Sequence, residues 1–222
     1  MVRVDRSYDR SWNEAGGWGD FPSMSFSVRP SHVLRLRFEP SYTKTHAKAQ
    51  YVMAVTDPTA VATYGRRYVF SDLVQSTASL VTRVDWTLTP KLSMQLYLQP
   101  LVVSGAYSAF KEFLTPGHFD FDVYGKNKGT VVRSPSGVYT VDPGNGATFS
   151  FPDPDFNFRS LLGNAVVRWE YRPGSTLFFV WQQSRQGVEP FGDFDFSRDY
   201  REMLDRQPEN VFAIKATYWI GL

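Results

Sequence analysis

Three segments of the sequence place aspartates between aromatic residues, and their side chains are the clearest candidates for chemistry. The segments are 119–122, 151–156 and 191–196, with the carboxylates Asp120, Asp122, Asp153, Asp155, Asp193 and Asp195. Carboxylates bind hard cations such as calcium, and exposed aromatic rings can stack on carbohydrate. The alternative interpretation is that the aspartates are solvated while the phenylalanines pack the loops together, and we favour this alternative.

The residue types that most often carry enzyme chemistry show no functional spacing. His32, His46 and His118 share no metal-ligand spacing, and the sequence contains no cysteine. It also has no Gly-x-Ser-x-Gly elbow, no phosphate-binding glycine loop and no His-Glu-x-x-His motif. We therefore predict no enzymatic activity, no cofactor and no metal centre in this chain.

The composition excludes further classes of protein. A formal net charge of +2 with scattered basic residues argues against nucleic-acid binding. No stretch approaches the roughly 18 consecutive apolar residues of a membrane-spanning helix. Aromatic residues nevertheless reach 16% of the chain, well above ordinary globular usage. That excess requires an explanation from the elements that carry the aromatic side chains.

Short turns containing Pro30, Pro90 and Pro173 separate segments of alternating hydrophobicity, which is typical of β-strands. Every second residue after each turn is apolar: Leu34, Leu36 and Phe38, then Met94, Leu96 and Leu98, then Leu177, Phe179 and Trp181. The strands that enter the turns alternate in the same way, and residues 212–222 form a seventh alternating strand. Because successive side chains of a strand point to opposite faces, one sheet surface is apolar.

The opposite surface carries ions. The charged residues that alternate with the apolar ones are Arg35, Arg37, Glu39, Arg83, Asp85, Arg168, Glu170 and Lys215. In a membrane barrel this surface lines the lumen, either as a polar passage or as a plugged interior braced by ion pairs. The residues alone leave these two alternatives open.

Connection lengths and aromatic positions favour a membrane protein over a soluble β-sandwich. Tight turns alternate with long polar segments at about 43–77, 105–155 and 184–210, as in outer-membrane barrels. Within the first long segment, 50–56 and 67–74 look extended, which places the actual connection near 57–65. Aromatics cluster near the short turns and again farther along the strands, as in interfacial girdles: Trp86, Trp169, Tyr171, Tyr218 and Trp181.

We therefore predict an all-β, antiparallel, up-and-down transmembrane β-barrel, of which this chain supplies about seven or eight strands of a larger whole. Residues 1–21 are expected to be an N-terminal loop or truncated strand, and residues 22–222 the C-terminal portion of the barrel. The start of the sequence lacks a secretory signal peptide, so we expect the natural beginning to be missing. The expected location is the bacterial outer membrane, and the cargo is unknown.

The expected partners are the lipid bilayer, the barrel-assembly machinery, which would recognise the final strand, and carbohydrate at the loops. A soluble β-sandwich that acts as a carbohydrate-binding module is the alternative function, since alternation alone also fits a sandwich.

The stretch FNFRSLLGNAVVRWEYRPGSTLFFVW at residues 156–181 resembles the C-terminal barrel of an uncharacterised family, domain of unknown function 5916. Residues 64–70, 96–100 and 210–219 are similar in pattern. The resemblance implies exported bacterial proteins in which a carbohydrate-binding-like β-sandwich precedes the barrel. That sandwich is absent from this sequence, so a role toward sugar is implied only through the resemblance.

Overall fold

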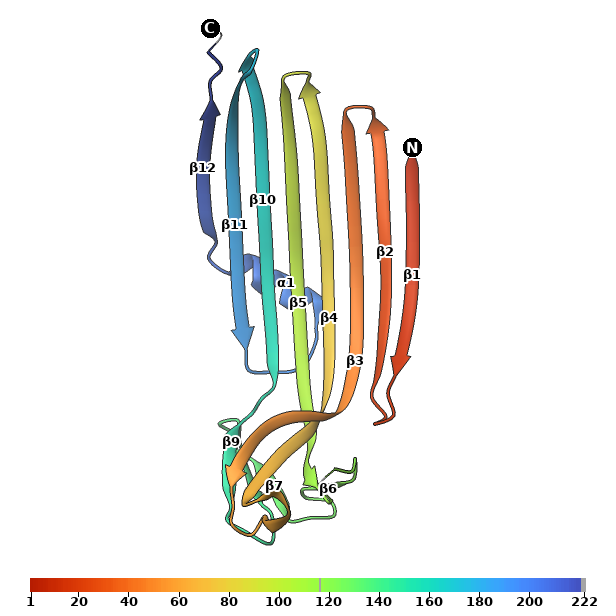
Figure 1. The fold of residues 1–222 in the computed structure, drawn as a ribbon, viewed down its shortest axis with the longest axis vertical. Coiled ribbons are helices and arrows are strands. Elements are labelled where there is room, and N and C mark those ends of the chain that lie inside the picture. The colour runs from red at the N-terminus through yellow and green to blue at the C-terminus, as the bar shows by residue number, and fades with distance from the viewer. Residues whose placement is uncertain (116, 221–222) are drawn as a thin grey trace.

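The computed structural model describes residues 1–115 and 117–220. Eight long strands form one antiparallel sheet in the order β1-β2-β3-β4-β5-β10-β11-β12 (Figure 1). Their bounds are β1 Val2–Trp12, β2 Trp18–Ser31, β3 Leu34–Thr56, β4 Arg66–Thr89, β5 Leu92–Phe113, β10 Phe156–Arg172, β11 Ser175–Glu189 and β12 Glu209–Thr217. The all-β, antiparallel prediction is confirmed.

Shorter elements lie in the connections. Strand β6 (Phe121–Val123) pairs with β5, and β7 (Thr130–Arg133), β8 (Val138–Asp142) and β9 (Phe149–Pro152) form a separate three-stranded sheet. The 3-10 helix η1 spans Val61–Thr63 and the α-helix α1 spans Phe196–Asp205. Among the described residues, no helix is long and apolar enough to cross a membrane.

Tight turns at one end of the sheet, hereafter the turn end, join β2 to β3, β4 to β5 and β10 to β11. The second and third turns are centred on Pro90 and Pro173, as predicted. The first lies at residues 32–33, because Ser31 still pairs with Leu34, and Pro30 occupies a register shift inside β2. A proline has no N–H to donate to the ladder, so it is accommodated at such an irregularity.

The long connections lie at the opposite end, hereafter the loop end. Strands β3 and β4 extend far into the first segment expected to be a connection, and the Asp57 amide donates to the Gly65 carbonyl at 2.9 Å. The connection near 57–65 is therefore confirmed. Residues 1–21 form β1 and the start of β2, and β1 pairs with β2 along its whole length, from Val2 opposite Val28 to Trp12 opposite Trp18.

Strand β12 ends earlier than predicted. It spans Glu209–Thr217, and its last pair is Thr217 with Thr176, next to the turn that begins β11. Here β12 reaches the level at which β11 begins, and the Trp219 amide donates to the Ser175 hydroxyl at 3.0 Å instead of to a strand backbone. The predicted end of this strand at Leu222 lies outside the described residues.

The register aligns apolar residues into rows that run across the whole sheet. One row consists of Val2, Val28, Leu36, Val84, Leu96, Ala165, Trp181 and Phe212, one residue from each strand. The next row toward the turn end holds Leu34, Trp86, Met94, Val167, Phe179 and Ile214. Directly paired residues share a face, so these rows form one continuous apolar surface.

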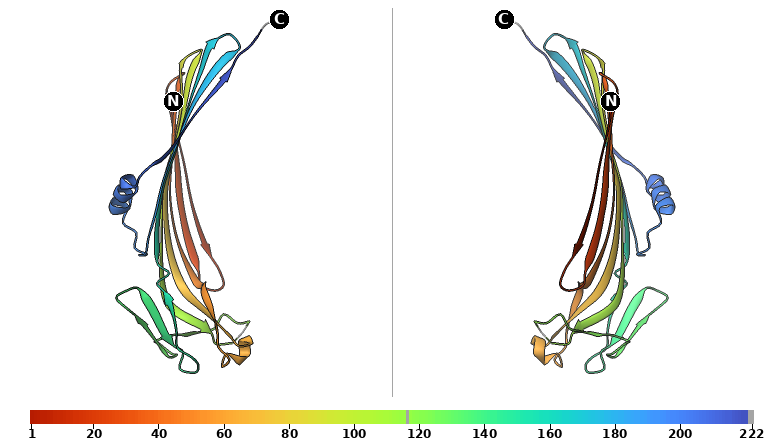
Figure 2. Two further views of the ribbon diagram at one scale, coloured as in Figure 1. Left: turned by 90° about the vertical axis from the view of Figure 1, so that its left-hand side faces the viewer. Right: turned by 90° about the vertical axis from the view of Figure 1, so that its right-hand side faces the viewer.

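The outer strands β1 and β12 each pair on one side only. Within the described residues the sheet is therefore open and does not close into a barrel. Figure 2 shows that this sheet is strongly twisted, with α1 standing off one face. The helix contacts β5, β10 and β11.

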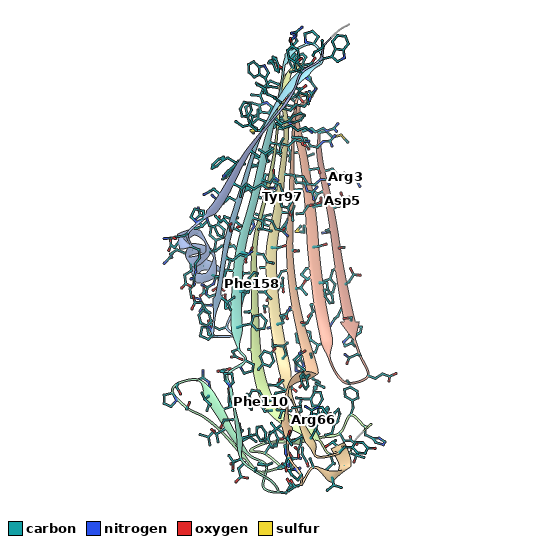
Figure 3. All side chains as sticks on the ribbon, turned by 60° about the vertical axis from the view of Figure 1, so that its left-hand side comes forward. Arg3, Asp5, Arg66, Tyr97, Phe110 and Phe158 are labelled. Carbon is teal, nitrogen blue, oxygen red and sulfur yellow. The ribbon has the colours of Figure 1, made fainter. Side chains whose placement is uncertain are left out.

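The buried hydrophobic core lies at the loop end rather than along the middle of the strands. It comprises Val69, Phe110, Tyr124, Val141, Phe149 and Phe151, which come from β4, β5, the small sheet and the segment between them. Figure 3 shows Phe110 at this end, far from Tyr97 in the central part of the sheet. The small sheet thus packs against the ends of β4 and β5 as a compact loop-end assembly.

The side of the main sheet that this core covers follows from residue parity. Between Phe70 and Asp72 strand β4 advances two residues while β5 advances three, from Lys111 to Ser108, so the bulge belongs to β5. Strand β4 therefore alternates without interruption, and buried Val69 lies on the same face as Asp85. By alternation the core therefore packs on polar-face positions of β4, and α1 lies against the apolar face. Because the sheet twists along its length, the small sheet and α1 nevertheless lie on the same side of the molecule in Figure 2.

Replacing Phe110 by alanine tests the loop-end core. Phe110 is 3% exposed, and truncating a buried phenylalanine usually costs about 3–5 kcal/mol. We expect residues 121–153 to become sensitive to limited proteolysis in Phe110→Ala. The matched Phe119→Ala variant should remain resistant because Phe119 is 66% exposed. Equal resistance of both variants would contradict the assignment of the core.

Candidate functional site

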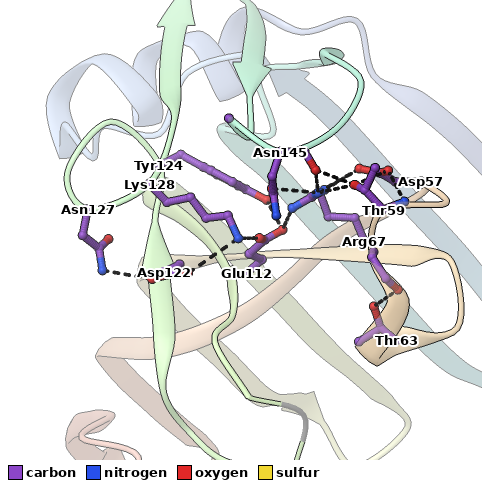
Figure 4. A network of polar contacts seen from close by, with 12 residues as sticks. Asp57, Thr59, Thr63, Arg67, Glu112, Asp122, Tyr124, Asn127, Lys128 and Asn145 are labelled. Atoms are coloured by element: carbon purple, nitrogen blue, oxygen red, sulfur yellow. Dashed lines mark hydrogen bonds and ion pairs between the residues drawn. The ribbon is translucent and has the colours of Figure 1, made fainter.

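A cluster of charged and polar side chains lies beside this core and forms the most developed polar site in the described part of the chain (Figure 4). This loop-end cluster consists of Asp57, Thr59, Arg67, Glu112, Asp122, Tyr124, Lys128 and Asn145. Its members come from the β3–β4 connection, the start of β4, the end of β5, β6 and the segments that follow it. It therefore joins segments that are far apart in the sequence.

Arg67 is the centre of the cluster. It is 3% exposed, and its Nε and Nη2 atoms donate to Oδ2 of Asp57 at 3.0 and 2.8 Å. Its Nη1 atom donates to Glu112 on the neighbouring strand. Asp57 also accepts hydrogen bonds from the Thr59 amide at 2.9 Å and the Thr59 hydroxyl at 2.7 Å. The guanidinium thus holds the β3–β4 connection against β5.

Glu112 links Arg67 to the segment that follows β6. The Tyr124 hydroxyl donates to its Oε2 atom at 2.8 Å, and Lys128 forms an ion pair with the same carboxylate. Lys128 lies 3.6 Å from Asp122 as well. Arg67 and Glu112 are buried, so an unpaired charge there would be costly, whereas the side chains of Lys128 and Asp122 are 20% and 19% exposed.

These contacts move the pKa values of the buried groups. Hydrogen bonds from Thr59 and then from Arg67 lower the pKa of Asp57. Burial alone would raise the pKa of Glu112, but hydrogen bonds from Lys128, Arg67 and Tyr124 outweigh it, and the pKa is lowered. Burial, with the nearby Glu112 charge, raises the pKa of Tyr124. At neutral pH both carboxylates are ionised and the phenol is protonated.

A cavity of about 200 Å³ opens beside the cluster, lined in part by Thr63, Tyr68, Phe113 and Asn145. Lowered carboxylate pKa values do not suit general acid or base catalysis, which works best with a pKa near the operating pH. Hydroxyl, amide and aromatic groups suit hydrogen bonding and ring contact with a small polar molecule. The chemistry that this arrangement supports is binding, together with bracing of the loops.

The aspartates singled out from the sequence do not converge on this cavity as a group. Asp195 caps helix α1 by accepting from the Arg198 amide at 2.8 Å, and Asp193 pairs with Arg198 at 2.5 Å. Only Asp122 touches the loop-end cluster, through Lys128. Asp120 contributes its backbone oxygen, which accepts from the Leu114 amide at 2.9 Å.

The remaining pair lies at the small sheet. Asp153 pairs with Arg133 at 2.6 Å, and Asp155 accepts from the Tyr107 amide at 2.6 Å. Burial raises the pKa of Asp155. In the described part of the chain, no three His, Cys, Asp or Glu side chains form a group able to hold a metal ion. These carboxylates stabilise local structure.

The eight predicted lumen residues lie together on the polar face. Arg35 pairs in register with Asp85, and Arg37 with Arg83. Asp85 accepts from the Gln95 amide group at 3.2 Å. On the other half of the sheet, Arg168 lies 3.7 Å from Glu170, and Phe178 is paired with both Arg168 and Lys215. Glu39 shares this face, opposite Val81.

The predicted interfacial aromatics lie on the apolar face or near its turn-end rim. Trp86 and Trp169 are 40% and 45% exposed, and the rings of Trp169 and Tyr171 are 6.2 Å apart. Tyr218 accepts from Arg172 at 2.5 Å beside the last turn. Trp181 lies farther from that turn and donates from its indole nitrogen to Asn210 at 2.9 Å.

Sequence reasoning missed the principal members of the loop-end cluster, Asp57, Arg67 and Glu112. One signal was present: Arg67 occupies the same alternating positions as the apolar Val69 and Leu73, so a cation falls on a buried face of β4. The partners of Arg67 lie 10 and 45 residues away, and no local pattern connects them.

Removing the Arg67 side chain would leave two buried carboxylates without their main partner. Breaking a buried ion pair from one side typically costs about 3–5 kcal/mol. We expect Arg67→Ala to destabilise the loop-end assembly by that order, measured as earlier proteolysis of residues 121–153 during urea titration. Arg66→Ala is the matched control, because Arg66 is the adjacent arginine and its side chain is exposed. An unchanged midpoint in Arg67→Ala would show that the cluster is not stabilising.

The loop-end assembly should also lose stability in acid. Asp57 and Glu112 have folded-state pKa values below their ordinary values of 3.8 and 4.5. As the pH falls, the unfolded chain therefore binds protons at these two carboxyl groups before the folded chain does. The stability that the two carboxylates contribute is complete above pH 4.5 and is lost as the pH falls through 4.5 and 3.8 toward the lowered pKa values. The measurement is the urea midpoint for cleavage of residues 121–153 by an acid-active protease across this interval.

The control for acid sensitivity is the double variant Asp57→Asn, Glu112→Gln, which retains Asp155. The raised pKa of Asp155 acts in the opposite sense, because its contribution is lost as the pH rises. The double variant should therefore lack the loss of stability in acid. An equal loss of stability in acid in the parent protein and in the double variant would show that other groups cause the loss.

Comparison with known proteins gives a family but no characterised relative. The model of the family described as Domain of unknown function (DUF5916) matches residues 11–222. No curated protein and no solved structure matches the chain. The match covers the eight-stranded sheet from the end of β1 onward, the loop-end assembly and α1. The chain therefore belongs to the DUF5916 family.

Proposed function

We propose that this chain forms part of the wall of a bacterial outer-membrane β-barrel and that its loop-end assembly covers the mouth of the polar interior. The observation that carries this proposal is the set of apolar rows across the sheet. Large side chains in these rows are exposed: Phe179 is 41% exposed and Ile214 is 70% exposed. Contiguous apolar patches of this extent are rare on soluble monomers, and lipid would cover them.

The length of the apolar band suits a bilayer. A membrane crossing requires about 9–11 tilted residues of strand. Counted along β4 from Leu88 near the turn, a crossing of about 10 residues reaches Ala78. The aromatic residues Trp86 and Trp169 then lie close to one membrane surface, while the long loops extend beyond the other. Short turns on one side and long loops on the other are typical of outer-membrane barrels.

The position of the small sheet supports this proposal over a soluble carbohydrate-binding β-sandwich. A sandwich stacks a second sheet onto the apolar face of the first. In this chain β7, β8 and β9 pack instead at the loop end, against Val69 and Phe110 at polar-face positions of β4 and β5. The apolar face along the middle of the strands receives no second sheet from the described residues.

The position of the small sheet also concerns the interior of the proposed barrel. Arg35, Asp85 and Gln95 lie in one row of the polar face, which suits a water-accessible lumen. Because the loop-end assembly packs on that face, we favour a covered mouth over an open pore. The loop-end cavity then becomes accessible from outside the cell as a binding site. The proposed role is transport control or scaffolding of surface loops, without catalysis.

A barrel wall of this kind needs further strands. Among the residues that the structure describes, the outer edges of β1 and β12 pair with no further strand, and an open sheet edge is not tolerated in hydrocarbon. We propose that strands outside this sequence close the barrel and that the barrel-assembly machinery inserts it. Additional alternating strands encoded with this chain would supply the missing partners.

Two adjacent residues of β5 test which face meets lipid. An arginine on the lipid face near the membrane centre costs about 2–4 kcal/mol in barrels, whereas lumen positions tolerate it. We expect Leu96→Arg to reduce folding into lipid vesicles strongly. Gln95→Arg should fold nearly as well as the parent protein. The measurement is the fraction of protein that resists heat denaturation in electrophoresis after folding from urea, and equal yields would contradict the proposed orientation.

A further inference from the structure

Helix α1 lies across the apolar face of the sheet. Phe194, just before the helix, contacts Tyr42 of β3 with ring centroids 5.8 Å apart. Near the other end of the helix, the Leu204 carbonyl accepts a hydrogen bond from Arg185 of β11. The helix therefore crosses the strands between β3 and β11, and Figure 2 shows it standing beside the sheet.

The two flanks of this helix differ in chemistry. On the side toward the loop end, Asp199 accepts from the Asn157 amide group at 3.1 Å, and Glu202 pairs with Arg159. On the side toward the turn end, Phe196, Tyr200 and Leu204 follow one another at four-residue spacing, which places them along one flank. All three side chains are exposed. The apolar flank thus faces the apolar band of the sheet.

A groove of about 350 Å³ separates this flank from the strands. Its walls include Tyr42, Leu80 and Val102 on the sheet and Phe194, Phe196 and Tyr200 on the helix side. Leu80 is 37% exposed and precedes the open apolar rows on the way to the turn end. The groove is therefore continuous with the surface that we propose to meet lipid.

Two cations neighbour residues that line this groove: Arg201 follows Tyr200 in the helix, and Lys44 is the next residue after Tyr42 on the same face of β3. Arg201 lies two residues from both Asp199 and Met203, which are buried against the sheet, so it occupies the outward side of the helix. Lys44 follows Tyr42 on the same face of β3, one step nearer the loop end. Both side chains are exposed. Neither belongs to the ion pairs formed among the described residues.

We propose that α1 lies at the outer surface of the membrane and that the groove on its turn-side flank holds an acyl chain of an anionic lipid, whose headgroup phosphate binds Arg201 and Lys44. An amphipathic helix with one apolar and one charged flank suits the boundary between headgroups and acyl chains. Long cationic side chains reach headgroups from this depth. This inference rests on the proposed function.

The test uses single cysteines, since this chain has none. Leu204→Cys lies on the apolar flank, and Asp205→Cys is the adjacent control on the charged side of the helix. Leu96→Cys reports on the sheet itself. Each variant is made in the protein expressed from its complete gene, labelled with an environment-sensitive nitrobenzoxadiazole dye, and folded into vesicles of phosphatidylcholine with and without phosphatidylglycerol. The measurement is quenching of the dye by iodide from the water phase.

We expect the labels at 96 and 204 to be quenched several-fold less than the label at 205. Phosphatidylglycerol should strengthen the protection at 204, and Arg201→Gln should remove that gain. Protection at 96 with full quenching at 204 would overturn the helix inference and leave the proposed function intact. Full quenching at 96 would overturn both. Protection at 204 that follows protein concentration, rather than phosphatidylglycerol, would indicate a second copy and also overturn the lipid assignment.

Discussion

The backbone register of the eight-stranded sheet is the constraint on which the rest of the structure depends. Because side chains alternate with a period of two, each interstrand pairing decides which residues share a face. With Leu36 opposite Val84 and Leu96 opposite Ala165, one apolar row runs unbroken from β1 to β12 and the next runs from β3 to β12. A slip of one residue in β4 would bring Arg83 or Asp85 into these rows. The ladder of hydrogen bonds therefore separates an apolar surface from an ionic one.

The loop end is organised differently, because there side chains of the same chain bury one another in a hydrophobic core. Tyr124 belongs both to the core with Phe110 and Phe149 and to the loop-end cluster, and the burial of Arg67 and Glu112 makes an unpaired charge costly there. The result is a network in which each carboxylate has several donors. Aromatic packing and ion pairing meet at Tyr124, whose ring packs in the core and whose hydroxyl donates to Glu112. The paired ions connect the β3–β4 connection, β5 and the segment after β6.

Helix α1 lies between the apolar surface of the sheet and the charged residues toward the loop end. Its buried Asp199 accepts from Asn157 toward the loop end, while Tyr200 borders an apolar groove toward the turn end. Asp195 begins the helix by accepting the Arg198 amide, which fixes where the first turn starts. The same ten residues thus satisfy charged partners on one flank and present an apolar surface on the other.

The sequence by itself determined seven of the eight long strands, two of the three turns and the two faces, because alternation and turn chemistry are local properties of neighbouring residues. It did not reveal the short strands β6 to β9, which lie in a segment expected to be a long connection. The apolar spacing of Phe196, Tyr200 and Leu204 after Asp195 was also a local signal for α1, although that segment was expected to be a loop. Only the tertiary structure decided the loop-end cluster. Asp57, Arg67 and Glu112 are separated by long stretches of chain, and contact between distant segments depends on how the strands bend and pack. The aspartates of the three aromatic–aspartate segments show the opposite case. The segments are similar in sequence, but their aspartates have different partners, since the fold places each loop in different surroundings.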